Sequence, residues 1–144
     1  MTKLLMMLAI LASVQGSTTL HNALPAEPRQ LGDEAMKFVA AADMKGLFAF
    51  IAEHMPLDRE AIDKLRDTSI EQRKKVSVAL GKPLGFAFIR ECRLADVLVR
   101  IVYVEKREKN VLRWQFVFYK ARNTWTMSSF NWDENLNSLF EPCD

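Results

Sequence analysis

Between residues 33 and 55 the apolar side chains recur every three or four residues, the spacing of one helical face. Asp43 and Gly46 interrupt this stripe, so a bend or a restart of the helix is expected there. A second helical region is predicted to begin after Asp58, a good N-cap, and to end at Gly81. The first half of the chain is therefore predicted to be helical.

From Leu84 onward the apolar period changes to two, which is typical of β-strands. Four successive segments show it: "LGFAFIREC", "VLVRIVYVEK", "VLRWQFVFYK" and "TWTMSSFNW". The short connectors between them suit hairpins, so neighbouring strands are expected to be antiparallel. The pattern predicts an α+β fold in which N-terminal helices pack on a curved, four-stranded antiparallel meander sheet.

One face of this sheet is predicted to be buried. Pairing Tyr103 with Leu112 and Ile101 with Trp114 gathers large apolar residues on a single side. The set on that side is Phe86, Phe88, Arg90, Cys92, Val97, Val99, Ile101, Tyr103, Trp114, Phe116 and Phe118. The helical stripe with Met44, Leu47 and Ile51 is expected to cover it. In this register Glu91 and Glu105 are assigned to the other, mixed face.

The first residues predict export. Lys3 precedes the uncharged run "LLMMLAILASV" and the small-residue stretch "QGST", the pattern of a secretory signal peptide over residues 1–16. The run is too short for a membrane span, so no span is expected in the mature chain. A periplasmic or secreted protein is predicted. Residues 17–31 hold two prolines and no apolar period, which favours a flexible lead-in before a single domain over 32–144.

Composition narrows the possible partners. A chain of 144 residues suits one domain, and a net charge of +2 gives no electrostatic case for binding nucleic acid. Its two histidines and two cysteines lack metal-ligand spacing, so neither a metal nor a cofactor is expected. Export would permit a disulfide between Cys92 and Cys143. A strand cysteine is equally often a small apolar residue, so paired and free thiols both stay open.

The order of elements resembles the nuclear transport factor 2-like (cystatin-like fold) superfamily, in particular its small exported, uncharacterised members. The segments that carry the resemblance are "LGKPLGFAFI", "LVRIVYVEKREKNVLRWQFVFYK" and "TWTMSSFNWDENLNSLF". The resemblance implies a cone-shaped domain, with a curved sheet around a long helix and a pocket at the open end. Members include ketosteroid isomerases, polyketide cyclases and non-catalytic binding modules, and many dimerise through the outer sheet face.

No catalytic residue is predicted. The isomerase-like members use an inward carboxylate, and the assumed register places none on the aromatic face. The sequence also lacks a nucleophile–base arrangement and a phosphate-binding loop. We therefore expect a non-catalytic domain that binds a small apolar or acidic ligand through Arg90, Tyr103 and Trp114. A polyketide-cyclase or ketosteroid-isomerase-like enzyme and a dimeric envelope interaction protein remain the alternatives.

Overall fold

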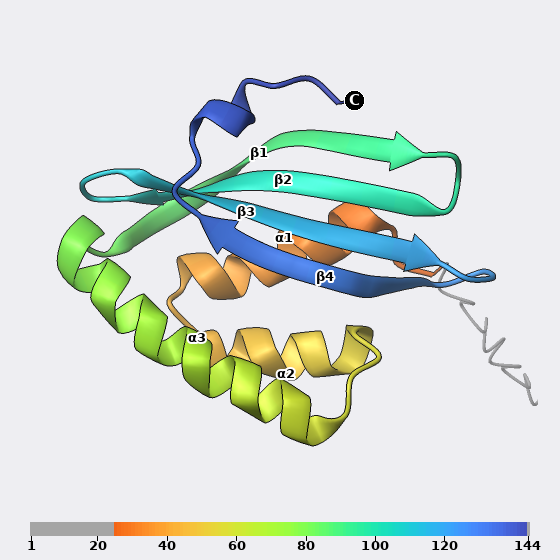
Figure 1. Cartoon of the computed structure of the whole chain (residues 1–144), viewed down its shortest axis with the longest axis horizontal. Coiled ribbons are helices and arrows are strands. Elements are labelled where there is room, and N and C mark those ends of the chain that lie inside the picture. The colour runs from red at the N-terminus through yellow and green to blue at the C-terminus, as the bar shows by residue number, and fades with distance from the viewer. Residues whose placement is uncertain (1–24, 144) are drawn as a thin grey trace, which may run out of the picture.

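A computed structural model describes residues 25–143, so the predicted signal peptide and most of the predicted lead-in lie outside the described residues. Within these described residues, three helices come first and a four-stranded sheet follows (Figure 1). The elements are α1 (Pro28–Ala40), α2 (Met44–His54), α3 (Arg59–Leu80), β1 (Pro83–Leu94), β2 (Leu98–Arg107), β3 (Val111–Lys120), β4 (Trp125–Asp133) and the short 3-10 helix η1 (Asn137–Leu139). The predicted α+β class is confirmed.

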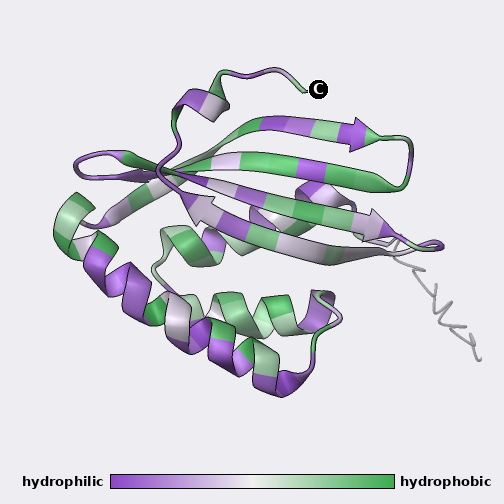
Figure 2. Ribbon diagram, in the orientation of Figure 1, coloured by the Kyte–Doolittle hydropathy of each residue, from purple (hydrophilic) through white to green (hydrophobic). Residues whose placement is uncertain are grey.

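The sheet is an antiparallel meander with the strand order β1-β2-β3-β4. All three helices lie on one side of it, whereas the C-terminal segment with η1 lies on the other side (Figure 1). We call these sides the inner and the outer face. Hydrophobic residues are frequent on α2 and on the central strands, while α3 carries long hydrophilic stretches (Figure 2). This difference indicates that α3 covers the sheet with a narrower apolar stripe than α2 does.

The helix boundaries follow from local capping. Helix α1 begins at Pro28, earlier than the predicted start at Asp33, because proline suits the first helical turn and the Glu27 amide donates to the Gln30 side chain. The expected restart near Asp43 is confirmed. Asp43 is the N-cap of α2, and its carboxylate accepts a hydrogen bond of 2.8 Å from the amide of Gly46.

The core lies between the helices and the inner face, as the alternation predicts. The central strands β2 and β3 contribute fully buried side chains, and α1 and α2 contribute the opposing ones. These residues are Val99, Ile101, Tyr103, Trp114, Phe116 and Phe118 from the sheet, and Met36, Val39, Leu47 and Ile51 from the helices. Phe88, near the sheet edge, is 36% exposed. The aromatic row is therefore mainly the wall of a core.

The observed register of β2 and β3 differs from the predicted one by two residues. Tyr103 pairs with Trp114 and Ile101 pairs with Phe116. The turn is tighter than expected, because the amide of Arg107 donates to the carbonyl of Asn110. A shift of two residues keeps every side chain on its face, so the buried residues of β2 and β3 survive the error. Val97 does not, because it precedes β2 and is exposed.

A bulge in β1 overturns a second expectation. Phe88 pairs with Tyr103, but Arg90 pairs with Val102, so one extra residue separates the two bridges. Such an insertion reverses the alternation that follows it. Arg90 and Cys92 therefore lie on the outer face, and their predicted position on the aromatic face is wrong. Glu91 pairs with Ile101 and so lies on the inner face, which makes its predicted assignment to the outer face wrong as well.

The C-terminal segment is fixed to the outer face. Cys92 and Cys143 form a disulfide with their Cα atoms 5.5 Å apart, which ties the segment to β1. Arg113 on β3 contacts Asp133, and this guanidinium lowers the pKa of the Asp133 carboxyl below its ordinary value.

Within residues 25–143, no helix is long and apolar enough to cross a membrane. No cluster of His, Cys, Asp or Glu in this range could hold a metal ion.

Candidate functional site

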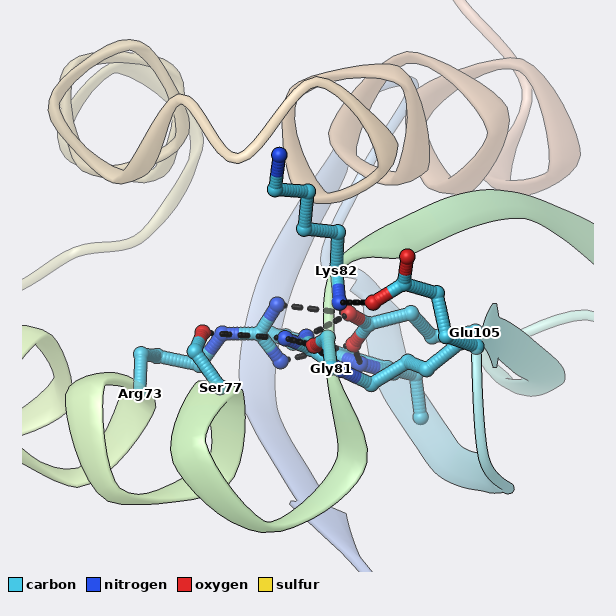
Figure 3. A network of polar contacts seen from close by, with 8 residues as sticks. Arg73, Ser77, Gly81, Lys82 and Glu105 are labelled. Atoms are coloured by element: carbon cyan, nitrogen blue, oxygen red, sulfur yellow. Dashed lines mark hydrogen bonds and ion pairs between the residues drawn. The ribbon is translucent and has the colours of Figure 1, made fainter.

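Glu105 is the centre of a buried charged cluster on the inner face (Figure 3). Its side chain is fully buried, so its predicted assignment to the outer face is wrong. Arg73 on α3 donates from both of its terminal nitrogens to the two carboxylate oxygens, at 2.6 Å each. Arg107 donates to Oε1, and the indole Nε1 of Trp114 donates to Oε2 at 2.8 Å. We refer to these four residues as the Glu105 cluster.

Simple geometry brings the cluster together. Glu105 lies two residues after Tyr103 on β2, so strand alternation directs it to the same inner face. Arg73 lies on the buried side of α3 with Ser69 and Ile62. Arg107 ends β2 and donates to the carbonyl of Gly81, beyond the C-terminus of α3. Figure 3 shows how the end of α3 and the following turn enclose this side of the cluster.

The bonding pattern of Glu105 limits its chemistry. A carboxylate offers about four lone-pair sites, and four N–H groups occupy them here. A carboxylate bound in this way has no free position for a substrate proton, so Glu105 is poorly suited to act as a general base. Its role is to hold two guanidinium groups in place.

The cluster also carries an uncompensated positive charge. Two buried guanidiniums, on Arg73 and Arg107, share the single carboxylate of Glu105. Arg107 relieves part of this imbalance by donating to the neutral oxygens of Gly81 and Ser77. Because buried charges require compensation, the excess favours an anion nearby.

A pocket of about 550 Å³ lies next to the cluster, between the α1–α2 turn, α3 and the start of β1. Arg73 and Arg107 line it, together with the apolar side chains of Met44, Ile70 and Pro83. Four basic side chains and one acidic side chain lie in its lining: Lys45, Arg73, Lys74 and Arg107 against Asp43. The size is within the usual range of small-molecule sites, and the charge favours an anionic group.

Trp114, which the sequence placed among the ligand-binding residues, belongs to the core. Its ring is fully buried and stacks with Phe116 and Trp132, at centroid distances of 5.9 and 6.1 Å. The guanidinium carbon of Arg73 lies 5.7 Å from the centroid of the Trp114 ring, a cation–π arrangement. Trp114 therefore supports Glu105 and Arg73 from the core side and is not among the residues that line the pocket.

Tyr103, another predicted site residue, points toward α1. Its hydroxyl donates to the carboxylate of Asp33 at 2.8 Å, and Asp33 also pairs with Arg29 at 2.8 Å. Burial raises the pKa of the Tyr103 phenol far above its ordinary value, and the hydrogen bond to Asp33 raises it further. The phenol is therefore a neutral donor that fixes α1 to the sheet.

Arg90, the third predicted residue, lies away from both of the others. Its terminal nitrogens donate to the backbone carbonyls of Leu139 and Ser138, at 2.8 and 2.7 Å. It thus holds η1 against the outer face. The structure does not bring Arg90 together with Tyr103 and Trp114, which lie on the inner face.

Sequence reasoning missed Arg73 and Arg107. Arg73 falls on the helical face that carries Ile62, Ser69 and Val76, and an arginine inside such a stripe is a detectable signal. Arg107 continues the inward alternation of Tyr103 and Glu105.

The chain matches no family model, no curated protein sequence and no solved structure.

Proposed function

We propose that this protein binds a small anionic ligand with an apolar part in the pocket beside the Glu105 cluster. The observation that carries the proposal is the pair of buried guanidiniums, Arg73 and Arg107, which share one carboxylate among the described residues and lie next to a pocket of ligand size. Binding an anion there would offset the remaining positive charge in a partly desolvated place.

The lining supports a carboxylate that carries an apolar chain or ring. Met44, Ile70 and Pro83 offer apolar contact, whereas Lys45 is exposed and can meet the charge of the ligand. Lys74 is less free, because it pairs with Glu71 at 2.6 Å. The mixture of an apolar wall with a few convergent polar groups is typical of small-molecule sites.

A binding role is favoured over catalysis at this place, because the bonds to Glu105 leave it no free lone pair.

We further propose that the domain belongs to the nuclear transport factor 2-like superfamily and acts after export. The order of helices and strands and the apolar run after Lys3 support these two points. The finer proposal of dimerisation through the outer face would require contact with the C-terminal segment, which lies on that face (Figure 1).

Calorimetric titration of the purified protein with decanoate tests the proposal. The wild type should bind, and Lys45→Glu should weaken binding at least about ten-fold, because it replaces attraction by repulsion at the pocket rim. Arg122→Glu is the matched control. It makes the same change of charge in the β3–β4 turn, and Arg122 does not line the pocket, so it should bind like the wild type.

Two outcomes would contradict the proposal. One is the absence of binding by decanoate and by an aromatic carboxylate such as naphthoate. The other is equal weakening by Lys45→Glu and Arg122→Glu, which would indicate only a general effect of net charge.

A further inference from the structure

Arg100 on β2 lacks the partners that other arginines have. Its Nε atom is buried and has no hydrogen-bond partner within residues 25–143, which is also true of the Nε of Arg90. Arg90, however, donates from its terminal nitrogens to two carbonyls. The other arginines in this range that are not exposed each donate to a carboxylate or a carbonyl: Arg29, Arg66, Arg73, Arg90, Arg107 and Arg113. A buried donor without an acceptor is destabilising, so an acceptor from outside the chain would be stabilising here.

A cavity of about 220 Å³ lies beside this side chain on the outer face of the sheet. Arg100 pairs directly with Cys92 on β1 and with Val117 on β3, and all three line the cavity. Leu94 and Leu98 complete the lining. The disulfide to Cys143 ties down the side chain of Cys92. The site is thus an apolar hollow, formed by three adjacent strands, that holds a single positive charge.

We propose that this cavity binds a short aliphatic carboxylate, whose oxygens accept hydrogen bonds from the guanidinium of Arg100. The charge-assisted bond would give the guanidinium of Arg100 an acceptor, and the alkyl chain would lie against Leu94, Leu98 and Val117. The volume corresponds to roughly seven water molecules, which suits a chain of about four to six carbons. This site is separate from the pocket beside the Glu105 cluster, because it lies on the opposite face of the sheet.

The charge of the lining favours a monoanion. Among the described residues that line the cavity, only Arg100 is charged, so a phosphate dianion would be left partly uncompensated between apolar walls. A neutral alcohol of the same length would leave the positive charge of Arg100 without a counter-charge. A short monocarboxylate satisfies both the apolar walls and the charge.

NMR titration of the ¹⁵N-labelled full chain with sodium hexanoate tests the proposal. The backbone amides of Cys92, Arg100 and Val117 and the side-chain Nε–H of Arg100 should shift with one common dissociation constant. Arg100→Gln should weaken binding about ten- to a hundred-fold, the effect of losing a hydrogen bond to a charged group. Lys106→Gln is the matched control, because it removes the same charge near the other end of β2, and it should bind hexanoate like the wild type.

A second variant keeps the test decisive if Arg100→Gln fails to fold. Val117→Phe should fill the cavity and abolish the hexanoate shifts while it retains Arg100. The proposal is overturned if either folded variant binds hexanoate as tightly as the wild type. It is also overturned if sodium chloride produces the same shifts, because the site would then bind an adventitious ion only. A third contradicting result would be hexanoate shifts confined to residues that line the pocket beside the Glu105 cluster.

Discussion

Tyr103 and Glu105 lie two residues apart on the same face of β2, and each connects the sheet to a different helix. Both side chains are fully buried. Tyr103 reaches α1 with a neutral phenol, and its partner Asp33 is itself 36% exposed. Glu105 reaches α3 with a full charge, and its partner Arg73 is 7% exposed.

The two positions show how burial and charge together determine what a polar group needs. The hydroxyl of Tyr103 needs one acceptor, and a half-exposed carboxylate is sufficient because water screens the remaining charge. The carboxylate of Glu105 is fully buried, so it needs a protein donor at each of its lone pairs. That requirement gathers two guanidiniums, and their excess charge forms the basic side of the candidate pocket.

Removing the charge at Glu105 should have the largest effect. Glu105→Gln keeps the shape of the side chain but leaves two buried guanidiniums without a counter-charge, so it should lower the free energy of unfolding by about 3–5 kcal/mol. Urea unfolding at neutral pH measures this loss. A loss below about 1 kcal/mol would mean that water reaches the cluster and that the two positions do not differ as described.

Removing one donor to Glu105 should have a smaller effect. Trp114→Phe retains an aromatic ring in the core but deletes the bond from Nε1 to Oε2, so it should cost about 2–3 kcal/mol. Because both residues act in the same bond, the double variant with Glu105→Gln should lose less than the sum of the single losses. Strict additivity would argue against the bond.

The phenol of Tyr103 should contribute less still. Tyr103→Phe should lower the free energy of unfolding by about 1 kcal/mol, the net value of one hydrogen bond. Because the folded pKa is raised, the stabilisation is complete below the ordinary tyrosine pKa of about 10 and declines as the pH rises toward the raised value. Unfolding measured from pH 8 to 11 should thus show the wild type losing its advantage over Tyr103→Phe above pH 10, whereas a constant difference would contradict the assignment.

Changing the partner of Tyr103 should have the smallest effect. Asp33→Asn removes a half-exposed charge, yet the new amide oxygen can still accept the hydrogen bond from the phenol. The expected change in the free energy of unfolding is below about 1 kcal/mol, as for other exposed ion pairs. A loss as large as that of Glu105→Gln would show that exposure does not separate the two positions.

Much of the inner face could be predicted from the sequence, because alternation depends only on local geometry. Alternation correctly places Tyr103 and Trp114 on the inner face. Glu105 is two residues after Tyr103, so alternation alone would also place it on the inner face, and its assignment to the outer face did not follow this rule. Its main partner, Arg73, is 32 residues away on a helix, so nothing local indicates that the charge is compensated.

The outer face was less predictable for a different reason. The bulge after Phe88 adds one residue to β1, and alternation fails beyond such a point. Arg90 and Cys92 changed face as a result. The position of Cys143 against Cys92 depends on the path of the C-terminal segment across the sheet, which local patterns do not encode.

The most direct test of the account is the NMR signal of the Arg73 Nε–H during titration of the labelled protein with decanoate. Arg73 uses its terminal nitrogens for Glu105 and lines the pocket, so an anion bound there should change the environment of its Nε–H. The account predicts that this signal shifts with the dissociation constant found by calorimetry, while the signal of the exposed Arg122 does not move. An unchanged Arg73 signal at saturating decanoate would contradict an anion site beside the Glu105 cluster.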